Sequence, residues 1–71
     1  MTEYRYTYGG KFVKLSRVKY THGVFDKRRN LVISCCECYD GAVVKMNHLA
    51  THSPGRRQDL AIVALSMEAC T

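Results

Sequence analysis

The sequence lacks any long apolar segment. None of its windows approaches the roughly 20 consecutive apolar residues that a membrane-spanning helix requires, so we expect no membrane partner. The first residues carry tyrosine and charged side chains instead of the apolar core of a signal peptide. Internal repeats and low-complexity tracts are also absent. Together these absences predict a cytoplasmic protein that is built as one domain, residues 1–71.

The missing export signal also decides how the four cysteines are interpreted. In a short secreted chain, four cysteines would predict two disulfides. In a chain that stays in the reducing cytoplasm, free thiols or metal ligands are expected instead. We therefore predict that Cys35, Cys36 and Cys38 remain reduced.

Acidic residues are scarce relative to basic ones. Six Asp and Glu stand against eleven Lys and Arg, which gives a formal net charge of +5. Such an excess on a small domain is most simply explained by a polyanionic partner, either nucleic acid or an acidic protein surface. The alternative is that the charge serves solubility alone, because small domains commonly carry net charges of about 2 to 8.

The N-terminal part of the sequence alternates in the manner of β-strands. Residues 3–8 place their three tyrosines on one face of a strand. Gly9-Gly10 follows as a tight turn, and residues 11–20 are rich in β-branched and aromatic side chains, which predicts a second strand. The alternation in this second segment is imperfect, and a bulge near Leu15-Ser16 or burial on both faces would explain it.

The central segment, residues 30–50, has an Asp-Gly pair between two runs of strand-forming residues. Asp and Gly both tolerate the positive φ of a tight primed turn, so the pair predicts a β-hairpin that closes at Asp40-Gly41. Residues 59–69 are ambiguous, because Asp59 is a possible helix cap while the apolar side chains alternate. We predict a strand there, paired with residues 42–49.

Residues 25–34 run from an aromatic-Asp pair, Phe25-Asp26, through a basic turn to Asn30-Leu31-Val32. This stretch resembles part of the first signature of Sm-like RNA-binding proteins, in which an aromatic-Asp pair precedes an Asn-Leu-Val strand. The glycine pattern upstream of that signature and the Arg-Gly motif near the C-terminus are missing from this sequence. What the resemblance implies is a small, five-stranded β-barrel.

The expected strands add up to an all-β fold. We predict a small five-stranded antiparallel meander or barrel of SH3-like or Sm-like size. The sequence also leaves open an α+β fold with a C-terminal helix, because residues 59–69 contain the helix formers Ala, Leu, Met and Glu.

A zinc site is the sharpest metal hypothesis that the sequence offers. Cys35 and Cys38 are followed by His48 and His52, with a spacer of nine residues between Cys38 and His48. In zinc fingers that spacer is commonly about twelve residues, and both histidines lie on a helix, which the hairpin at Asp40 excludes. We therefore predict no metal and no other cofactor, with a zinc-finger-like module as an alternative.

A thiol nucleophile is a weaker hypothesis. Cys36 or Cys38 with His48 or His22 would make a Cys-His pair. No local signature, oxyanion-hole turn or second acid accompanies such a pair. We therefore expect that the protein is not an enzyme.

Basic and aromatic residues form the largest candidate site. Lys and Arg side chains are interleaved with tyrosines on the first two expected strands, a mixture that small β-domains use to hold phosphates and stack bases. Charged loops at residues 26–30 and 52–58 add further cations. We predict a non-enzymatic nucleic-acid-binding protein whose contact residues are Tyr4, Arg5, Tyr6, Tyr8, Lys11, Lys14, Arg17, Lys19, Lys27, Arg28, Arg29, Arg56 and Arg57.

The same residues have two other interpretations. In so small a protein, tyrosines also suit the core and its rim, and lysines on edge strands prevent aggregation. The alternative function is a small phage-type inhibitor or adaptor, which would bind and block a host protein through exposed tyrosines and a sheet edge.

Overall fold

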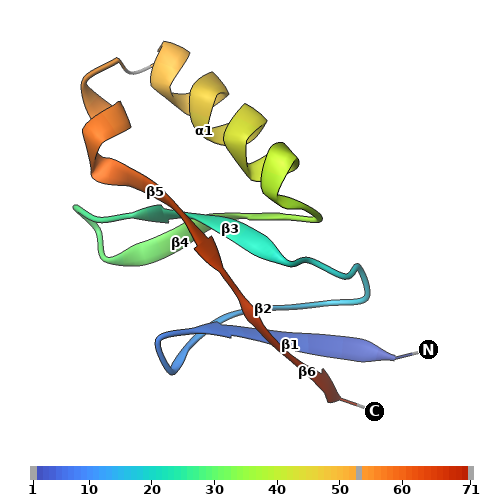
Figure 1. Ribbon diagram of the computed structural model, residues 1–71. Coiled ribbons are helices and arrows are strands. Elements are labelled where there is room, and N and C mark those ends of the chain that lie inside the picture. Colours follow the sequence, from blue (N-terminus) through green and yellow to red (C-terminus); the bar gives the residue numbers. More distant parts are fainter. Residues whose placement is uncertain (1, 53, 71) are drawn as a thin grey trace.

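The computed structural model describes residues 2–52 and 54–70, except for the side chains of Pro54, Arg56 and Arg57. Within these residues the chain forms six strands, one α-helix and one 3-10 helix (Figure 1). In chain order the elements are β1 (Glu3–Tyr8), β2 (Lys11–Ser16), β3 (His22–Asp26), β4 (Leu31–Cys36), α1 (Tyr39–His52), η1 (Pro54–Asp59), β5 (Leu60–Ala64) and β6 (Ser66–Cys70).

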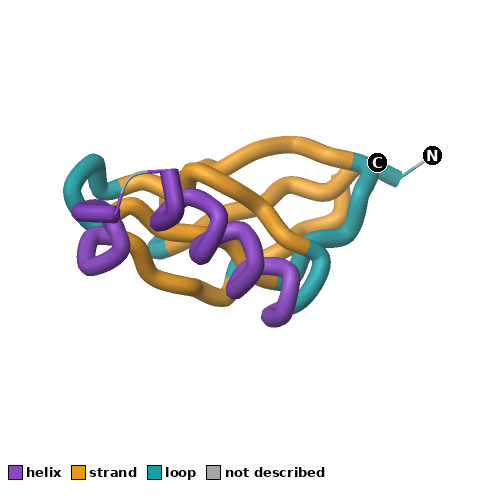
Figure 2. Tube along the Cα trace, turned by 90° about the horizontal axis from the view of Figure 1, so that it is seen from above, coloured by secondary structure: helices purple, strands orange, loops and turns teal. Residues whose placement is uncertain are grey.

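The strands form two antiparallel sheets of three strands each. The first sheet has the order β2-β1-β6, and the second sheet has the order β4-β3-β5. Only Leu65 separates β5 from β6, so one run of chain leaves the second sheet and enters the first. The helix α1 lies over the second sheet, which gives three layers in the order helix, second sheet and first sheet (Figure 1, Figure 2).

The helix α1 stands where the sequence predicted a hairpin at Asp40-Gly41, and that prediction was wrong. The Cys38 carbonyl accepts the Ala42 N–H at 3.1 Å, so the helix begins directly after Cys38. Asp40 lies in the first turn, where the helix dipole favours a negative charge. The apolar residues of α1 that are buried or half-buried recur at helical spacing, namely Ala42, Val43, Met46, Leu49 and Ala50.

The strand predictions for the two ends of the chain were confirmed in part. β1 spans the predicted residues 3–8, and Gly9-Gly10 forms the predicted turn with φ angles of 58° and 81°. β2 ends at Ser16 instead of residue 20, and the bulge of this hairpin lies opposite the step from Tyr6 to Thr7. The C-terminal segment is extended, as predicted, and forms the strands β5 and β6. β5 pairs with β3 and not with residues 42–49, which are helical.

The fold is therefore mostly β with one helix, and it is neither a five-stranded meander nor a closed barrel. In the described sheets, β2 and β4 each pair with one neighbour only, so the two sheets stay open between these edge strands. The α+β alternative is nearer to the architecture, although its helix was placed where the structure has β5 and β6. The barrel implied by the Sm-like resemblance is not formed.

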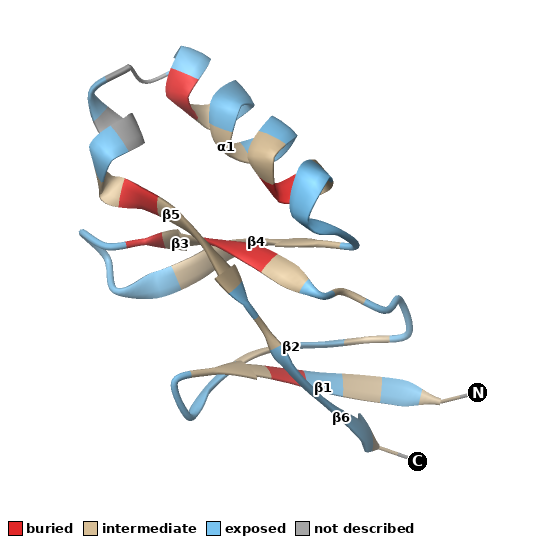
Figure 3. Cartoon of the chain, viewed as in Figure 1, coloured by how far each residue is buried: buried red, intermediate tan, exposed pale blue. Residues whose placement is uncertain are grey.

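The principal core lies between α1 and the second sheet. Val24 of β3 is fully buried, and Leu60 of β5 is almost fully buried. Ala42 and Ala50 are buried on the helix that covers these strands (Figure 3). Small side chains on the helix allow its backbone to approach the sheet closely, which is how so short a chain builds a packed layer.

A smaller core belongs to the first sheet and is centred on Tyr6. This residue is fully buried, and its ring meets Tyr20 edge-on with centroids 5.4 Å apart. Its hydroxyl donates to the Val18 carbonyl and accepts the Tyr20 N–H at 2.8 Å. Tyr6 thereby fastens the connector of residues 17–21 to the first sheet.

Candidate functional site

A groove lies between the edge strands β2 and β4, at the end of the molecule where the turns of the two hairpins lie. Its volume of about 420 Å³ is in the range of sites that bind small organic ligands. We call it the turn-end groove. Its lining residues are Tyr8, Gly9, Lys11, Phe12, Val13, Phe25, Asn30, Leu31 and Val32.

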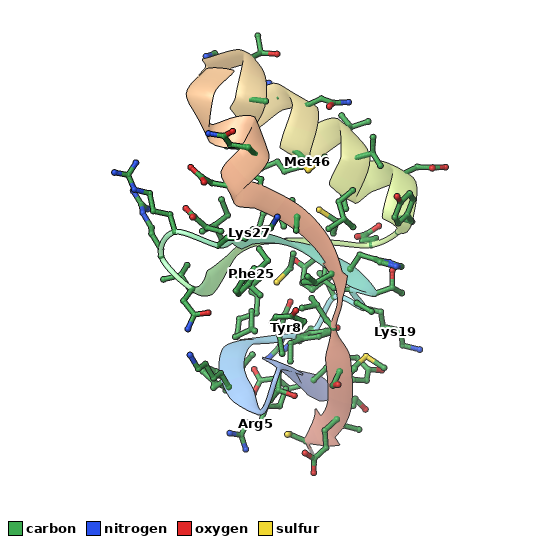
Figure 4. The ribbon with its side chains drawn as sticks, turned by 60° about the vertical axis from the view of Figure 1, so that its left-hand side comes forward. Arg5, Tyr8, Lys19, Phe25, Lys27 and Met46 are labelled. Atoms are coloured by element: carbon green, nitrogen blue, oxygen red, sulfur yellow. The ribbon has the colours of Figure 1, made fainter. Side chains whose placement is uncertain are left out.

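Aromatic rings from both sheets build the turn-end groove. Tyr8 of β1 and Phe25 of β3 point toward one another between the sheets (Figure 4), with ring centroids 5.2 Å apart. Phe12 of β2 is 54% exposed and lines the same groove. The guanidinium carbon of Arg5 lies 5.5 Å from the centroid of the Phe12 ring. The groove therefore has an aromatic floor and one ring that is open to solvent.

A basic turn, residues 27–30, borders the groove and connects β3 to β4. Asn30 lines the groove and closes the turn with a positive φ of 58°. The buried Asp26 carboxylate accepts the N–H groups of Arg28 and Arg29 at 3.0 and 3.2 Å. It also lies 3.8 Å from the guanidinium nitrogen of Arg29. This carboxylate fixes the backbone that displays the cations.

The basic turn has a second anchor, because the Lys27 N–H donates to the Asp59 carbonyl at 2.7 Å. The three cationic side chains of the turn are exposed. Lys11 lines the turn-end groove from the other hairpin, so cations stand on both sides of it. Arg56 and Arg57 belong to η1, which ends at Asp59, but their side chains lie outside the described residues.

Three of the predicted contact residues lie near the β2–β3 connector instead of the groove. The Lys14 ammonium is 5.2 Å from the centroid of the Tyr20 ring, and the Lys19 ammonium is 5.7 Å from that of Tyr4. Lys19 points away from the groove (Figure 4), and Arg17 is exposed on the connector. The predicted cations therefore form two groups and not one continuous surface.

The predicted tyrosine stripe faces inward. Tyr8 lines the groove, Tyr4 is half-buried, and the fully buried Tyr6 offers no surface for a base. Tyr6 is therefore a core residue and is not available as one of the predicted nucleic-acid contacts. Phe12 and Phe25 line the groove but are not among the predicted contact residues. Phe12 belongs to the interleaved basic and aromatic residues of the first two predicted strands, and Phe25 lies near the end of the strand that leads into the basic turn.

The predicted thiol residues surround a second hollow, of about 570 Å³, at the start of α1. Cys35, Cys36, Cys38 and His48 are among its lining residues. Burial raises the pKa of the Cys35 thiol above its ordinary value, the Lys14 cation partly offsets this rise, and Cys36 adds to it. A raised pKa disfavours the thiolate, which is the nucleophilic form of a cysteine.

The four residues of the zinc alternative lie on β4, on the connection between β4 and α1, and on α1. His48 and His52 share a face of α1, with ring centroids 4.6 Å apart. The sulfur of Cys38 accepts the Gly41 N–H at 3.3 Å, so this thiol caps the helix, whereas Cys35 belongs to β4. Over residues 2–52 and 54–70, no three His, Cys, Asp or Glu side chains come together in the arrangement of a metal site.

Comparisons of the chain with known protein families, with curated proteins and with solved structures gave no match. In the part of the chain that the structure describes, no helix is long and apolar enough to cross a membrane.

Proposed function

We propose that this protein is a non-enzymatic nucleic-acid-binding protein that contacts its ligand at the end of the molecule carrying both hairpin turns. The observation that carries the proposal is the basic turn, in which Lys27, Arg28 and Arg29 are exposed on a backbone held by a buried carboxylate. Lys11 adds a cation from the other hairpin. Cations displayed on a fixed backbone neutralise neighbouring phosphates without the cost of ordering a flexible loop.

Salt dependence is the direct test of this proposal. Each phosphate contact releases condensed counterions, so the logarithm of the affinity falls linearly with the logarithm of the salt concentration. We expect a labelled oligonucleotide to lose affinity by orders of magnitude between about 50 and 200 mM salt, measured by fluorescence anisotropy. A single-charge variant, Arg28→Gln, should reduce the steepness of this plot by about 0.7 to 0.9.

The control variant is Lys45→Gln, which removes the same charge from the exposed surface of α1. Lys45 lies outside the turn-end groove and the basic turn, so we expect its salt plot to keep the steepness of the unmodified protein. Equal effects of R28Q and K45Q would show that net charge alone attracts the ligand. Absence of binding to any DNA or RNA at about 50 mM salt would reject the proposal.

A second candidate function, the inhibitor or adaptor, is favoured by a separate observation. The helix α1 leaves Tyr39 56% exposed and Val44 68% exposed. Exposed aromatic and aliphatic side chains are the usual anchors of protein–protein contacts, which depend little on salt. This alternative predicts that the protein captures a protein partner with an affinity that is nearly constant from about 50 to 200 mM salt, while oligonucleotides do not bind.

A further inference from the structure

The turn-end groove has a lining that suits a nucleobase. Its lining includes Tyr8 and Phe25, whose rings lie between the sheets, and Phe12 at its rim, together with the charged or polar residues Lys11 and Asn30. Aromatic rings stack on every base, because every base has a π face. The floor is already assembled, since the Tyr8 and Phe25 rings contact one another across the two sheets.

The charges around the groove narrow the class of ligand further. Lys11 lies on one side, and the basic turn of residues 27–30 lies on the other. An aliphatic or neutral aromatic ligand would make apolar contacts with the lining but no favourable electrostatic contacts with these cations. A nucleotide unit of a strand matches both features, because a flat base is joined to phosphates on its two sides.

The edge strands supply backbone hydrogen-bonding groups beside the groove. β2 and β4 each pair on one side only within the described sheets, and the groove lies between them. Backbone N–H and C=O groups on an unpaired strand side are free to bond to a ligand. The polar edge of a base would therefore find donors and acceptors beside the aromatic floor.

We propose that the turn-end groove takes one unpaired base, so that the ligand is single-stranded nucleic acid. This inference rests on the proposed function and specifies its ligand. In a duplex the faces of each base are covered by stacked neighbours and its edge is paired, so the rings of the groove do not reach it unless the base is extruded. A single strand places a base in the groove while its phosphates lie against Lys11 and the basic turn.

Phe12 is the residue whose truncation tests the base pocket most directly. Its ring is 54% exposed, so truncation removes little of the packed core. The guanidinium group of Arg5 lies over one face of the same ring, so the other face is the one that can stack on a base. Phe12 pairs with Thr7 in the β1–β2 ladder, so its side chain lies on the outer face of the first sheet and acts as a stacking ring at the rim of the groove. Tyr8 and Phe25, by contrast, lie between the sheets.

The first experiment compares a single-stranded oligonucleotide with a duplex of the same length at one salt concentration. We expect the single strand to bind more tightly, and Phe12→Ala to weaken its binding by about 5- to 150-fold, the range of one lost stacking contact. The matched control is Leu15→Ala, because Leu15 is 48% exposed on the same strand and does not line the groove. L15A should bind as the unmodified protein does.

A second experiment separates stacking from charge. An oligonucleotide with one abasic position keeps all its phosphates but lacks one base. Its affinity for the unmodified protein should fall by about as much as Phe12→Ala lowers the affinity for the intact oligonucleotide. F12A should bind the abasic and the intact oligonucleotides with nearly equal affinity. A strand with 2-aminopurine at that position should change its fluorescence on binding to the unmodified protein only.

The outcomes distinguish this inference from the function on which it rests. Salt-sensitive binding with equal affinity for single strand and duplex, or equal effects of Phe12→Ala and Leu15→Ala, would overturn the base pocket and leave nucleic-acid binding in place. Competition by a free mononucleotide as strong as that by the oligonucleotide would also overturn it, since the ligand would then not be a strand. Failure of every oligonucleotide to bind would overturn the proposed function itself.

Discussion

Tyr6 fixes the connector between β2 and β3 through its hydroxyl group. The hydroxyl donates to the Val18 carbonyl and accepts the Tyr20 N–H, and the whole residue is buried. Replacing Tyr6 by Phe removes the partner of both backbone groups and leaves them unpaired. We expect Y6F to lower the free energy of unfolding by about 1–3 kcal/mol, measured by urea denaturation.

The control for this prediction is Tyr4→Phe. Tyr4 meets the Lys19 ammonium through its ring face, and a phenylalanine ring keeps that contact. We expect Y4F to change the free energy of unfolding by no more than about 0.5 kcal/mol. Equal losses in the two variants would contradict the role given to the Tyr6 hydroxyl.

The sequence predicted the face of the strand on which Tyr6 lies but not the hydrogen bonds of its hydroxyl group. Alternation over residues 3–8 correctly placed the three tyrosines on one face, because side chains in a strand point to opposite sides in turn. The partners of the Tyr6 hydroxyl are Val18 and Tyr20, which the pattern of β-branched and aromatic residues assigned to the second strand, residues 11–20. A hydrogen bond to a distant connector leaves no periodic signal in the sequence.

At the scale of elements, Gly23 allows the β5–β6 run to cross from one sheet to the other. A Cβ atom at Gly23 would lie 2.8 Å from the Ser34 carbonyl oxygen, 2.9 Å from Cγ1 of Val32 and 3.3 Å from Cδ2 of Leu65. The Ser34 oxygen is backbone in the neighbouring strand β4, so it does not yield without disturbing the sheet. We expect Gly23→Ala to lower the free energy of unfolding by about 1–3 kcal/mol in urea denaturation.

Gly55→Ala is the matched control for the glycine at the crossing. A Cβ atom at Gly55 would meet no atom within 4 Å, so the added methyl group should change the stability by no more than about 0.5 kcal/mol. An unchanged stability of G23A would mean that the strands at the crossing shift easily. The close packing between Gly23 and Leu65 would then be unimportant for joining the two sheets.

The segment around Asp40-Gly41 shows why one element was predicted wrongly. Asp-Gly is a strong local turn signal, and two strand-like runs surround it. The same residues also carry a helical pattern, in which Ala42, Met46 and Ala50 recur four residues apart, and Cys38 caps the first turn. The long-range packing of the buried Ala42 and Ala50 on the second sheet decides between two locally acceptable structures.

At the scale of the whole molecule, the turn-end groove depends on contacts between segments that are distant in the sequence. The sequence indicated the cations of the basic turn and Lys11, since charged residues at hairpin turns are exposed in most folds. It did not indicate the groove, because residues of β2 and β4 line one groove only when the first sheet folds over the second and leaves β2 and β4 unpaired with each other. A predicted closed barrel would have paired those edges.

The packing of the whole molecule also predicts that the protein folds without zinc. In a zinc finger the metal contributes the free energy of folding outright, so a chelator unfolds the domain. Here Cys38 caps α1, and the buried side chains of Val24 and Leu60 supply the packing beneath the helix. We therefore expect the same melting temperature by circular dichroism with and without EDTA, and less than one equivalent of zinc by elemental analysis of protein purified without added metal. One equivalent of zinc together with a transition lost in EDTA would contradict this prediction, and it would require Cys35 and Cys38 to approach His48 and His52 more closely than the structure shows.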